Sequence, residues 1–549
     1  MGHLKYLIGV LVALLFTLYT WLGAGTISPW LRPWALWFAL LLAEMMFIFP
    51  EQRRTENLFE ARKRVLSNVL RDPLTWCCVG LFLFLTLQWL NAATFLEWDA
   101  TTRTWTAIFP PLDWMAHPEA EAILATVPKA SSGAIVKDPY FAWLPWSLRA
   151  DEARIVLDWF IPIFVSLLAV RHATGRHTKR LLMVYTCIMT CVLAMGGIFD
   201  WTMGTQVLCW GREAKAFFFA TFGYPNHAAC FFPAVMLMAT GLLLWSYEHR
   251  ERTRIPLILS IITIALCGIS GVLSGSRAGV LFVAAIVAFS VFYIPFRFAG
   301  SWNWSRRILV TLLLLSTATV VLGTAGFRIY AIQANRDRKE AIAAATTEEE
   351  KEDALRMPTY APMPAFDPVI DEIAQTEWAT FFENPMLMRS GYQGILALRQ
   401  HDEYFWYGAG ARSFSRLSGK YIDPNNPEEA DWFDKRMGIG QANVHNDTLQ
   451  FLAEHGWIGY GLMLACTLCL LVPFMRDLLT SPRHTQNDIV ADRCWLNRIN
   501  AFTLFAFIAI LLITIHSLME LVFRSPACLM LWGLLFVCAP GFMPRRQKQ

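Results

Sequence analysis

Polar side chains that could do chemistry are concentrated in the stretch "NVHNDTLQFLAEHGWIG", residues 443–459, directly before an apolar run long enough to cross a membrane. Asn446 or Asp447 can cap a helix here, and a helix N-terminus offers free backbone N–H groups to an anion. His445 beside that terminus would be able to accept a proton near neutral pH. Asp447 and Glu454 are seven residues apart, so they share one helical face. The alternative interpretation is an interfacial helix whose polar side chains face lipid headgroups.

A second candidate is Arg277, which lies in "SGVLSGSRAGVLF" between two apolar runs. A guanidinium near lipid is costly and usually has a partner. Arginine binds phosphate oxygens in a bidentate manner, for which lysine is less suited, and the flanking Gly275 and Gly279 would allow a ligand to come close. The alternative is an arginine that extends to the phosphates of the outer leaflet.

A third candidate is the stretch "FFFATFGYPNHAACFF". Asn226 follows a proline at the expected start of a span, and the basic residues Arg212 and Lys215 precede the stretch. Proline near a helix start and a polar cap would explain much of this pattern by structure alone.

The fourth stretch is "HSLMELVFRSPA", in which His516, Glu520 and Arg524 follow one another at intervals of four residues. This spacing suits a ladder of ion pairs along one helix, which is the alternative to a role in binding.

The composition is that of a membrane protein. Of the 549 residues, 55% are hydrophobic and 16% are charged, and the mean hydropathy is +0.39. A water-soluble chain of this length needs more polar surface. We therefore expect an all-α, polytopic membrane protein of about 12 transmembrane helices, each of roughly 20 residues. The expected spans are residues 5–24, 33–50, 74–92, 154–171, 181–199, 227–247, 257–273, 278–296, 308–326, 457–475, 499–520 and 525–542.

The placement of Lys and Arg predicts how these spans are oriented, because short cytoplasmic loops collect positive charge. The loops "EQRRTENLFEARKR", "RHATGRHTKR" and "EHRERTR" and the tail "PRRQKQ" all fall on one side. Both termini are therefore predicted to be cytoplasmic, and the four polar stretches are predicted to lie outside. The resulting organisation is residues 1–326 with spans 1–9 and an outer loop at about 93–153, a large outer helical loop at 327–446, and an interfacial helix with the last spans at 447–549.

These four stretches resemble the motifs of the O-antigen ligase and O-antigen polymerase superfamily, and they occur along the chain in the same order as in that superfamily. "HNDTLQFLAEHGWIG" is similar to its His-Asn…Glu-x-Gly signature, "SGSRAGV" to its Ser-Arg motif, and "TFGYPNH" to its Thr-Phe-Gly-x-Pro-Asn motif. "HSLMEL" looks like an element of its late span. The resemblance extends over about residues 217–526, and the N-terminal third matches only by hydropathy.

The resemblance implies a GT-C-like glycosyltransferase, working without a metal or other cofactor on the periplasmic face of the bacterial inner membrane. It would move a glycan from undecaprenyl diphosphate to an acceptor sugar hydroxyl. Carried over, Arg277 would neutralise the diphosphate leaving group, which gains negative charge in the transition state. His445 would accept the proton of the acceptor hydroxyl or orient the acceptor, and Glu454 would support the motif. The implied partners are the lipid-linked donor, a glycan acceptor and the bilayer, with no nucleic acid.

This chain departs from the superfamily in one place. Members often carry an arginine a few residues before the Thr-Phe-Gly, where this sequence reads "FFFA". Arg212, Lys215 or Arg389 could substitute for it. The candidate catalytic residues are thus His445 and Arg277, and the candidate substrate-binding residues are Arg212, Lys215, Asn226, Arg389, Asn446, Glu454 and His516.

Several functions fit these motifs. Transfer to lipid A-core by a ligase is favoured over polymerisation of repeat units, and a protein O-oligosaccharyltransferase is a third possibility because the motifs do not encode the acceptor. A flippase for lipid-linked oligosaccharides, or another transporter, is the alternative outside enzymes. Against it stand the lack of an internal repeat and the lack of ionisable residues in the middle of the spans. A scaffold for envelope assembly would have no need of Arg277.

Overall fold

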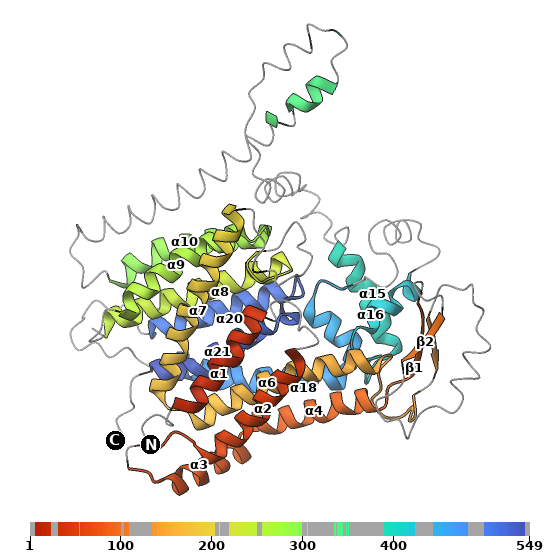
Figure 1. The fold of residues 1–549 in the computed structure, drawn as a ribbon, viewed down its shortest axis with the longest axis horizontal. Coiled ribbons are helices and arrows are strands. Elements are labelled where there is room, and N and C mark those ends of the chain that lie inside the picture. Colours follow the sequence, from red (N-terminus) through yellow and green to blue (C-terminus); the bar gives the residue numbers. More distant parts are fainter. Residues whose placement is uncertain are drawn as a thin grey trace.

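The computed structural model shows a bundle of long helices with a smaller polar region at one end (Figure 1). The structure describes residues 6–22, 31–53, 55–99, 104–108, 134–137, 139–203, 208, 219–249, 255–298, 305, 334–335, 337–343, 347, 350, 389–422, 443–480 and 499–543.

Eight helices in the described part of the chain are long and apolar enough to cross a membrane, as expected of a polytopic membrane protein. Three shorter apolar helices correspond to the expected first span and the last two. The predicted span at 308–326 lies outside the described residues, so the number twelve stays a prediction. The long helices are α2 (Leu31–Ile48), α4 (Pro73–Leu90), α6 (Ala150–Ala173), α7 (Arg176–Met203), α8 (Pro225–Glu248), α9 (Ile255–Leu273), α10 (Arg277–Arg297) and α18 (Asp447–Thr480), and the shorter ones are α1 (Leu7–Thr17) with the π-helical turn η2 (Leu18–Leu22), α20 (Ala501–Ser517) and α21 (Pro526–Cys538) with the turn η9 (Ala539–Phe542).

Helix α8 is the centre of the bundle, and nearly all of its residues are buried. It packs against α9, α10 and α20 (Figure 1). The approach to α20 is close because Gly241 has no side chain: a Cβ there would lie 2.8 Å from the Cβ of Phe505 and 3.1 Å from the Cα of Phe502. Small residues at helix contacts are the usual way for membrane helices to gain van der Waals contact, since lipid offers no hydrophobic driving force between them.

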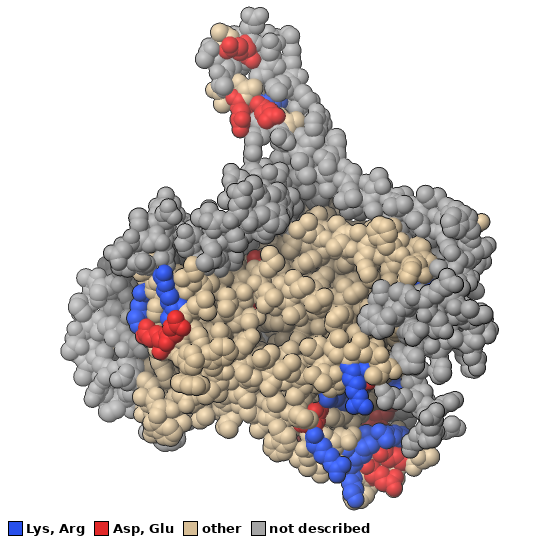
Figure 2. Space-filling model, turned by 180° about the vertical axis from the view of Figure 1, so that it is seen from behind, with Lys and Arg blue, Asp and Glu red and all other residues tan. Residues whose placement is uncertain are grey.

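Within the described residues, the basic segment at 171–180 contacts the end of the first basic loop and the segment before the C-terminal tail. Nε of Arg171 lies 2.7 Å from the Asp72 carboxylate, which also bonds His172 at 2.8 Å. Arg180 donates to the carbonyl of Gly541 at 2.8 Å, which ties the C-terminal segment to α7. The short helix α3 (Leu58–Arg71), which the sequence analysis did not predict, runs along this end. Figure 2 shows a broad uncharged face between groups of charged side chains, as a bilayer requires.

The outer loop at 93–153 contains a small β-sheet, so the expectation of an all-α chain is wrong for this segment. Strands β1 (Thr94–Asp99), β2 (Thr104–Ile108) and β3 (Ala134–Lys137) pair antiparallel in the order β2-β1-β3. The sequences "TFLEWD" and "TWTAI" are rich in threonine and aromatic residues, which favour extended backbone. The hydropathy of the loop could not show this, because the strands are short and do not cross the membrane.

Helix α18 is broken at Gly456, directly before the expected span at 457–475. Gly456 has φ 62° and ψ −173°, a conformation that breaks the helical ladder. The break leaves backbone N–H groups without helical partners, and a neighbouring loop supplies them. Trp457 N–H donates to the carbonyl of Phe405 at 3.0 Å, and Ile458 N–H donates to the carbonyl of Trp406 at 3.1 Å.

The same loop is held by two further glycines with positive φ, Gly408 and Gly410. Gly410 N–H donates to the carbonyl of Glu454 at 2.7 Å. A Cβ on Gly408 would lie 2.1 Å from that same carbonyl oxygen. The loop follows α15 (Arg389–Glu403) and leads into α16 (Ser413–Leu417) and the turn η6 (Ser418–Tyr421). The glycines of "GAGARSF" therefore hold the loop between α15 and α16 against the first part of α18.

We predict that Gly456→Ala destabilises the protein by at least about 1–3 kcal/mol, the usual cost of a strained backbone conformation. A Cβ at this position would lie 2.5 Å from the carbonyl carbon of Trp406, so the loop would have to move as well. Thermal unfolding of the purified protein in detergent measures the effect.

Gly461→Ala on the same helix is the matched control, because a Cβ there meets nothing within 4 Å. It should leave the unfolding temperature unchanged or raise it slightly, since alanine favours helix. Equal unfolding temperatures for the two variants would show that the contact between Gly456 and the loop at Trp406 does not stabilise the protein.

Candidate functional site

A chain of hydrogen bonds connects all four polar stretches at one end of the bundle. Nδ1 of His445 lies 2.8 Å from Oε2 of Glu520, and the hydroxyl of Tyr224 donates to the same oxygen at 2.7 Å. Nδ2 of Asn226 donates to the Tyr224 hydroxyl at 3.1 Å, and Ser276 donates to Oδ1 of Asn226. Residues that are up to 296 positions apart (224 against 520) therefore form one polar cluster.

Helix starts place Tyr224 and Ser276 in this cluster. Tyr224 is the N-cap of α8, with Pro225 as the first helical residue. Ser276 is the N-cap of α10, and Gly275 with φ 73° turns the chain between α9 and α10. The buried His227 adds a tie at the same level, because its Nε2 lies 2.8 Å from the carbonyl oxygen of Leu521.

His445 itself has an uncommon backbone conformation, with φ 51°. For a residue other than glycine this is strained, and such strain is often found at functional positions. The next residue, Asn446, holds the conformation by capping α18: its Oδ1 accepts from Leu449 N–H at 3.0 Å. The side chain of His445 is 16% exposed. Because Nδ1 is bound to the carboxylate, Nε2 is the nitrogen left to face a ligand.

The environment of Glu520 favours its ionised form. Burial raises the pKa of this carboxyl, but the hydrogen bond and charge of His445 and the hydrogen bond of Tyr224 outweigh burial, so the pKa lies below its ordinary value. An ionised Glu520 accepts both bonds and fixes the tautomer of His445 with the proton on Nδ1. When the imidazole carries no charge, this tautomer leaves Nε2 without a proton and able to accept one.

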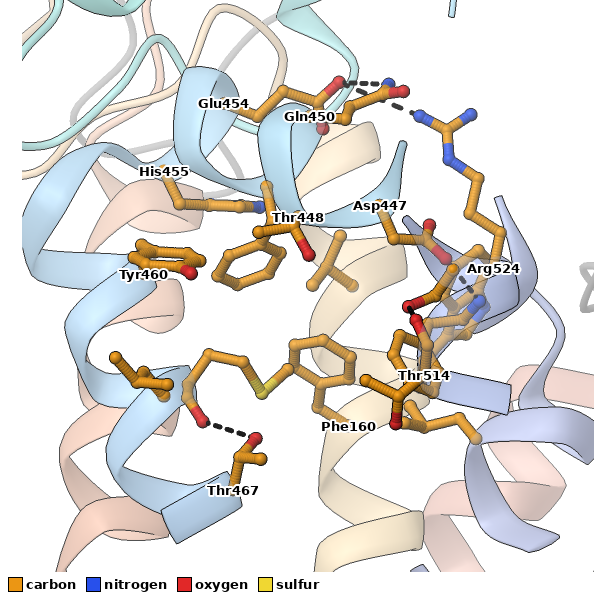
Figure 3. A pocket seen from close by; sticks show the side chains of 18 of the residues that line it. Phe160, Asp447, Thr448, Gln450, Glu454, His455, Tyr460, Thr467, Thr514 and Arg524 are labelled. Carbon is orange, nitrogen blue, oxygen red and sulfur yellow. Dashed lines mark hydrogen bonds and ion pairs between the residues drawn. The ribbon is translucent and has the colours of Figure 1, made fainter. Parts of the chain in front are cut away.

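A second polar group lies one to two turns further along α18 (Figure 3). Glu454 is buried and accepts from Nε2 of Gln450 at 2.7 Å, and the guanidinium of Arg524 lies 3.8 Å from it. Arg524 also donates to Asn443 at 2.7 Å, and Asp447 accepts from the N–H of Phe523 at 2.7 Å. These contacts tie the start of α18 to the turn η8 (Val522–Arg524).

The predicted ion-pair ladder at 516–524 does not form. Helix α20 ends at Ser517, so the spacing of four residues no longer brings these side chains together. Glu520 binds His445 instead, and Arg524 binds Asn443 and Glu454. His516 is 2% exposed, packs edge-on against Phe282 at 5.1 Å between ring centroids, and has no hydrogen-bond partner on either nitrogen within the described part of the chain.

The remaining predicted residues are only partly described. Arg277 is the first residue of α10, directly after Ser276, so its backbone lies at the cluster. Arg389 begins α15. Arg212 and Lys215 lie outside the described residues.

Tyr224 and Glu520 were quoted within their motifs but were not predicted to be site residues. The signal that could have found Glu520 is its position after the end of a span, where a helix-breaking turn frees its side chain. Its pairing with His445, 75 positions away, has no local signature.

Comparison with known proteins assigns no family to the chain. No family profile matches it, and a search of the curated proteins finds no match. Within the described residues, no group of three or more His, Cys, Asp or Glu side chains could hold a metal ion.

We predict that Glu520→Gln destabilises the protein at neutral pH and that the difference from wild type closes in acid. Because the folded-state pKa is lowered, the stabilisation from the ionised carboxyl is complete above the ordinary pKa of about 4.3 and is lost as pH falls through the folded-state value. Thermal unfolding from about pH 8 to about pH 2, which extends below the folded-state pKa, measures this gap. Asp402→Asn, at an exposed carboxylate on α15, is the control. A gap that stays constant into acid would refute the charge-based interpretation.

Proposed function

We propose that the protein is a GT-C-like membrane glycosyltransferase that moves a glycan from undecaprenyl diphosphate to an acceptor hydroxyl on the periplasmic face of the bacterial inner membrane. The observation that carries the proposal is the hydrogen-bonded series from His445 through Glu520, Tyr224 and Asn226 to Ser276. This series connects the candidate base to the residue before Arg277.

The chemistry assigned to His445 follows from its geometry. As the acceptor oxygen attacks the anomeric carbon of the donor, Nε2 of His445 takes the proton of that hydroxyl. The bond between the anomeric carbon and the diphosphate oxygen breaks, and the electron pair leaves with undecaprenyl diphosphate. Glu520 keeps the imidazole in the correct tautomer and stabilises the imidazolium that forms, as a carboxylate does for a catalytic histidine.

The leaving group gains negative charge, and the cluster is suited to an anion. Helices α8 and α10 both begin there, at Pro225 and Arg277. The N-terminus of a helix carries partial positive charge and free N–H groups, and two such termini meet at this point. A guanidinium on the first residue of α10 adds a full charge and two parallel N–H donors for phosphate oxygens.

The acceptor is not encoded in this cluster. Transfer to lipid A-core, as by an O-antigen ligase, is the version we favour, and polymerisation of repeat units or protein O-glycosylation would use the same step. A flippase is the candidate outside enzymes. Proteoliposomes that contain labelled lipid-linked glycan and candidate acceptors discriminate between these functions, because a transferase forms a covalent product and a flippase only moves the label across the membrane.

We predict that His445→Ala lowers the rate of glycan transfer by about 10²–10⁴-fold, the usual contribution of a general base. The measurement is product formation by purified protein in the proteoliposomes described above. His249→Ala is the control, because His249 stacks on Trp245 at the other end of α8. Undiminished transfer by His445→Ala would exclude the histidine as the base.

For Arg277 we predict a graded loss. Arg277→Ala should reduce transfer by about 10²–10³-fold, as expected when one group that stabilises the transition-state charge is removed. Arg277→Lys should retain part of the activity, because lysine keeps the charge and loses the bidentate contact. Arg180→Lys, at the opposite end of the bundle, should be neutral. If alanine and lysine at position 277 gave equal, wild-type rates, the diphosphate would have to bind elsewhere.

A further inference from the structure

A cavity of about 340 Å³ lies beside the polar cluster, between α6, α18, α20 and α21 (Figure 3). Its volume is within the range of roughly 300–1,000 Å³ that is typical of small-molecule sites. Most of its wall is apolar, and the wall is formed by membrane-spanning helices. The main apolar side chains are Val156, Phe160, Met463, Leu464, Leu529 and Trp532.

The two ends of the cavity differ in polarity. Asp447, Gln450, Glu454 and Arg524 lie around the end nearest the cluster, and the side chains around Phe160 and Thr467 form the other end (Figure 3). Two carboxylates face one guanidinium, which already binds Glu454 and Asn443. Among the residues that line this end, the one guanidinium is already bound, so an anionic headgroup would have to break the contacts of Arg524 to Glu454 and Asn443.

The wall also contains a free hydrogen-bond donor. Trp159 lines the cavity, and its Nε1 is buried and has no hydrogen-bond partner among the described residues. A buried donor without a partner costs free energy comparable to a lost hydrogen bond. A ligand oxygen next to the indole would remove this cost.

The cavity has exposed side chains on its rim. Leu464 of α18 is 43% exposed and Leu518, directly after α20, is 47% exposed, and both line the cavity. Only 22% of the apolar window of α18 is buried, so this helix stands largely in contact with its surroundings. In a bilayer these surroundings are lipid chains, and the rim between α18 and α20 is continuous with the lipid-facing surface.

We propose that this cavity binds the hydrocarbon chain of a membrane lipid, which enters from the bilayer between α18 and α20. The chain fills the apolar end, and an uncharged oxygen of the lipid, such as an ester carbonyl, accepts from Trp159. The proposal goes beyond glycan transfer and does not depend on it, because it concerns binding alone. It places a lipid beside His445, since Asp447 at the polar end is two residues from it.

Photolabelling tests the proposal. The protein is reconstituted in vesicles with a phospholipid that carries a diazirine near the end of one acyl chain, or with a polyprenyl phosphate that carries a diazirine in its chain. Labelled residues are then identified by mass spectrometry of peptides. We expect label on the residues that line the cavity, and the more efficient probe identifies the kind of chain.

A matched pair of variants makes the test specific. Leu464→Trp fills the entrance, and Leu468→Trp places the same side chain one turn further along α18, at a leucine that is 45% exposed and does not line the cavity. Leu464→Trp should lower the labelling of cavity residues by about tenfold, the loss that two buried methylene groups would account for. Leu468→Trp should leave it unchanged. Both positions are exposed, so both variants should fold.

Two outcomes would overturn the proposal: label spread evenly over the lipid-facing helices, or equal labelling in the two tryptophan variants. Labelling of His445→Ala separates this result from the proposed reaction, because that variant should lose transfer and keep the bound chain. Trp159→Phe keeps the ring and removes the N–H, so it should weaken labelling by the ester-bearing phospholipid. Undiminished labelling in this variant would rule out the indole as the contact to the lipid oxygen.

Discussion

The carboxylate of Glu520 is the interaction on which the outer end of the bundle depends. It accepts from His445 on α18 and from Tyr224 at the start of α8, while its own chain segment follows α20. Through Tyr224 and Asn226 it also reaches Ser276 at the start of α10. Charge-assisted hydrogen bonds are about twice as strong as neutral ones, and near lipid there is little water to replace them. One carboxylate therefore fixes the relative positions of the starts of three helices.

Glycines provide the second constraint, because they allow helix α18 to be interrupted close to the polar cluster. Gly456 interrupts α18, and the loop with Gly408 and Gly410 contacts the break closely enough to satisfy its free N–H groups. Non-helical backbone at membrane depth is tolerated only when it is covered by protein in this way. The short first part of α18 can thus lie against η8 and place Glu454 in the wall of the cavity, while the second part continues as a span. The cluster and the cavity beside it both arise from this break.

The start of α18 adjoins two different environments. The starts of α8 and α10 lie on the side of Ser276 and offer positive partial charge. Asp447, Glu454 and Arg524 lie at the polar end of an apolar cavity. In the proposed reaction the diphosphate would bind at the starts of α8 and α10, next to His445 with its strained backbone.

The sequence by itself determined the membrane character, most of the helix positions and the break at Gly456, because hydropathy, capping residues and glycine act over a few neighbouring residues. It also identified His445, Asn226 and Glu454 as residues worth placing. It missed the small sheet at 94–137, whose strands are too short to stand out from a loop rich in aromatic residues. Only the tertiary structure decided that Glu520 pairs with His445 and not with its own neighbours, because α20 ends before Glu520 and the contact depends on how separate helices pack. The cavity, which is lined by four helices, was decided in the same way.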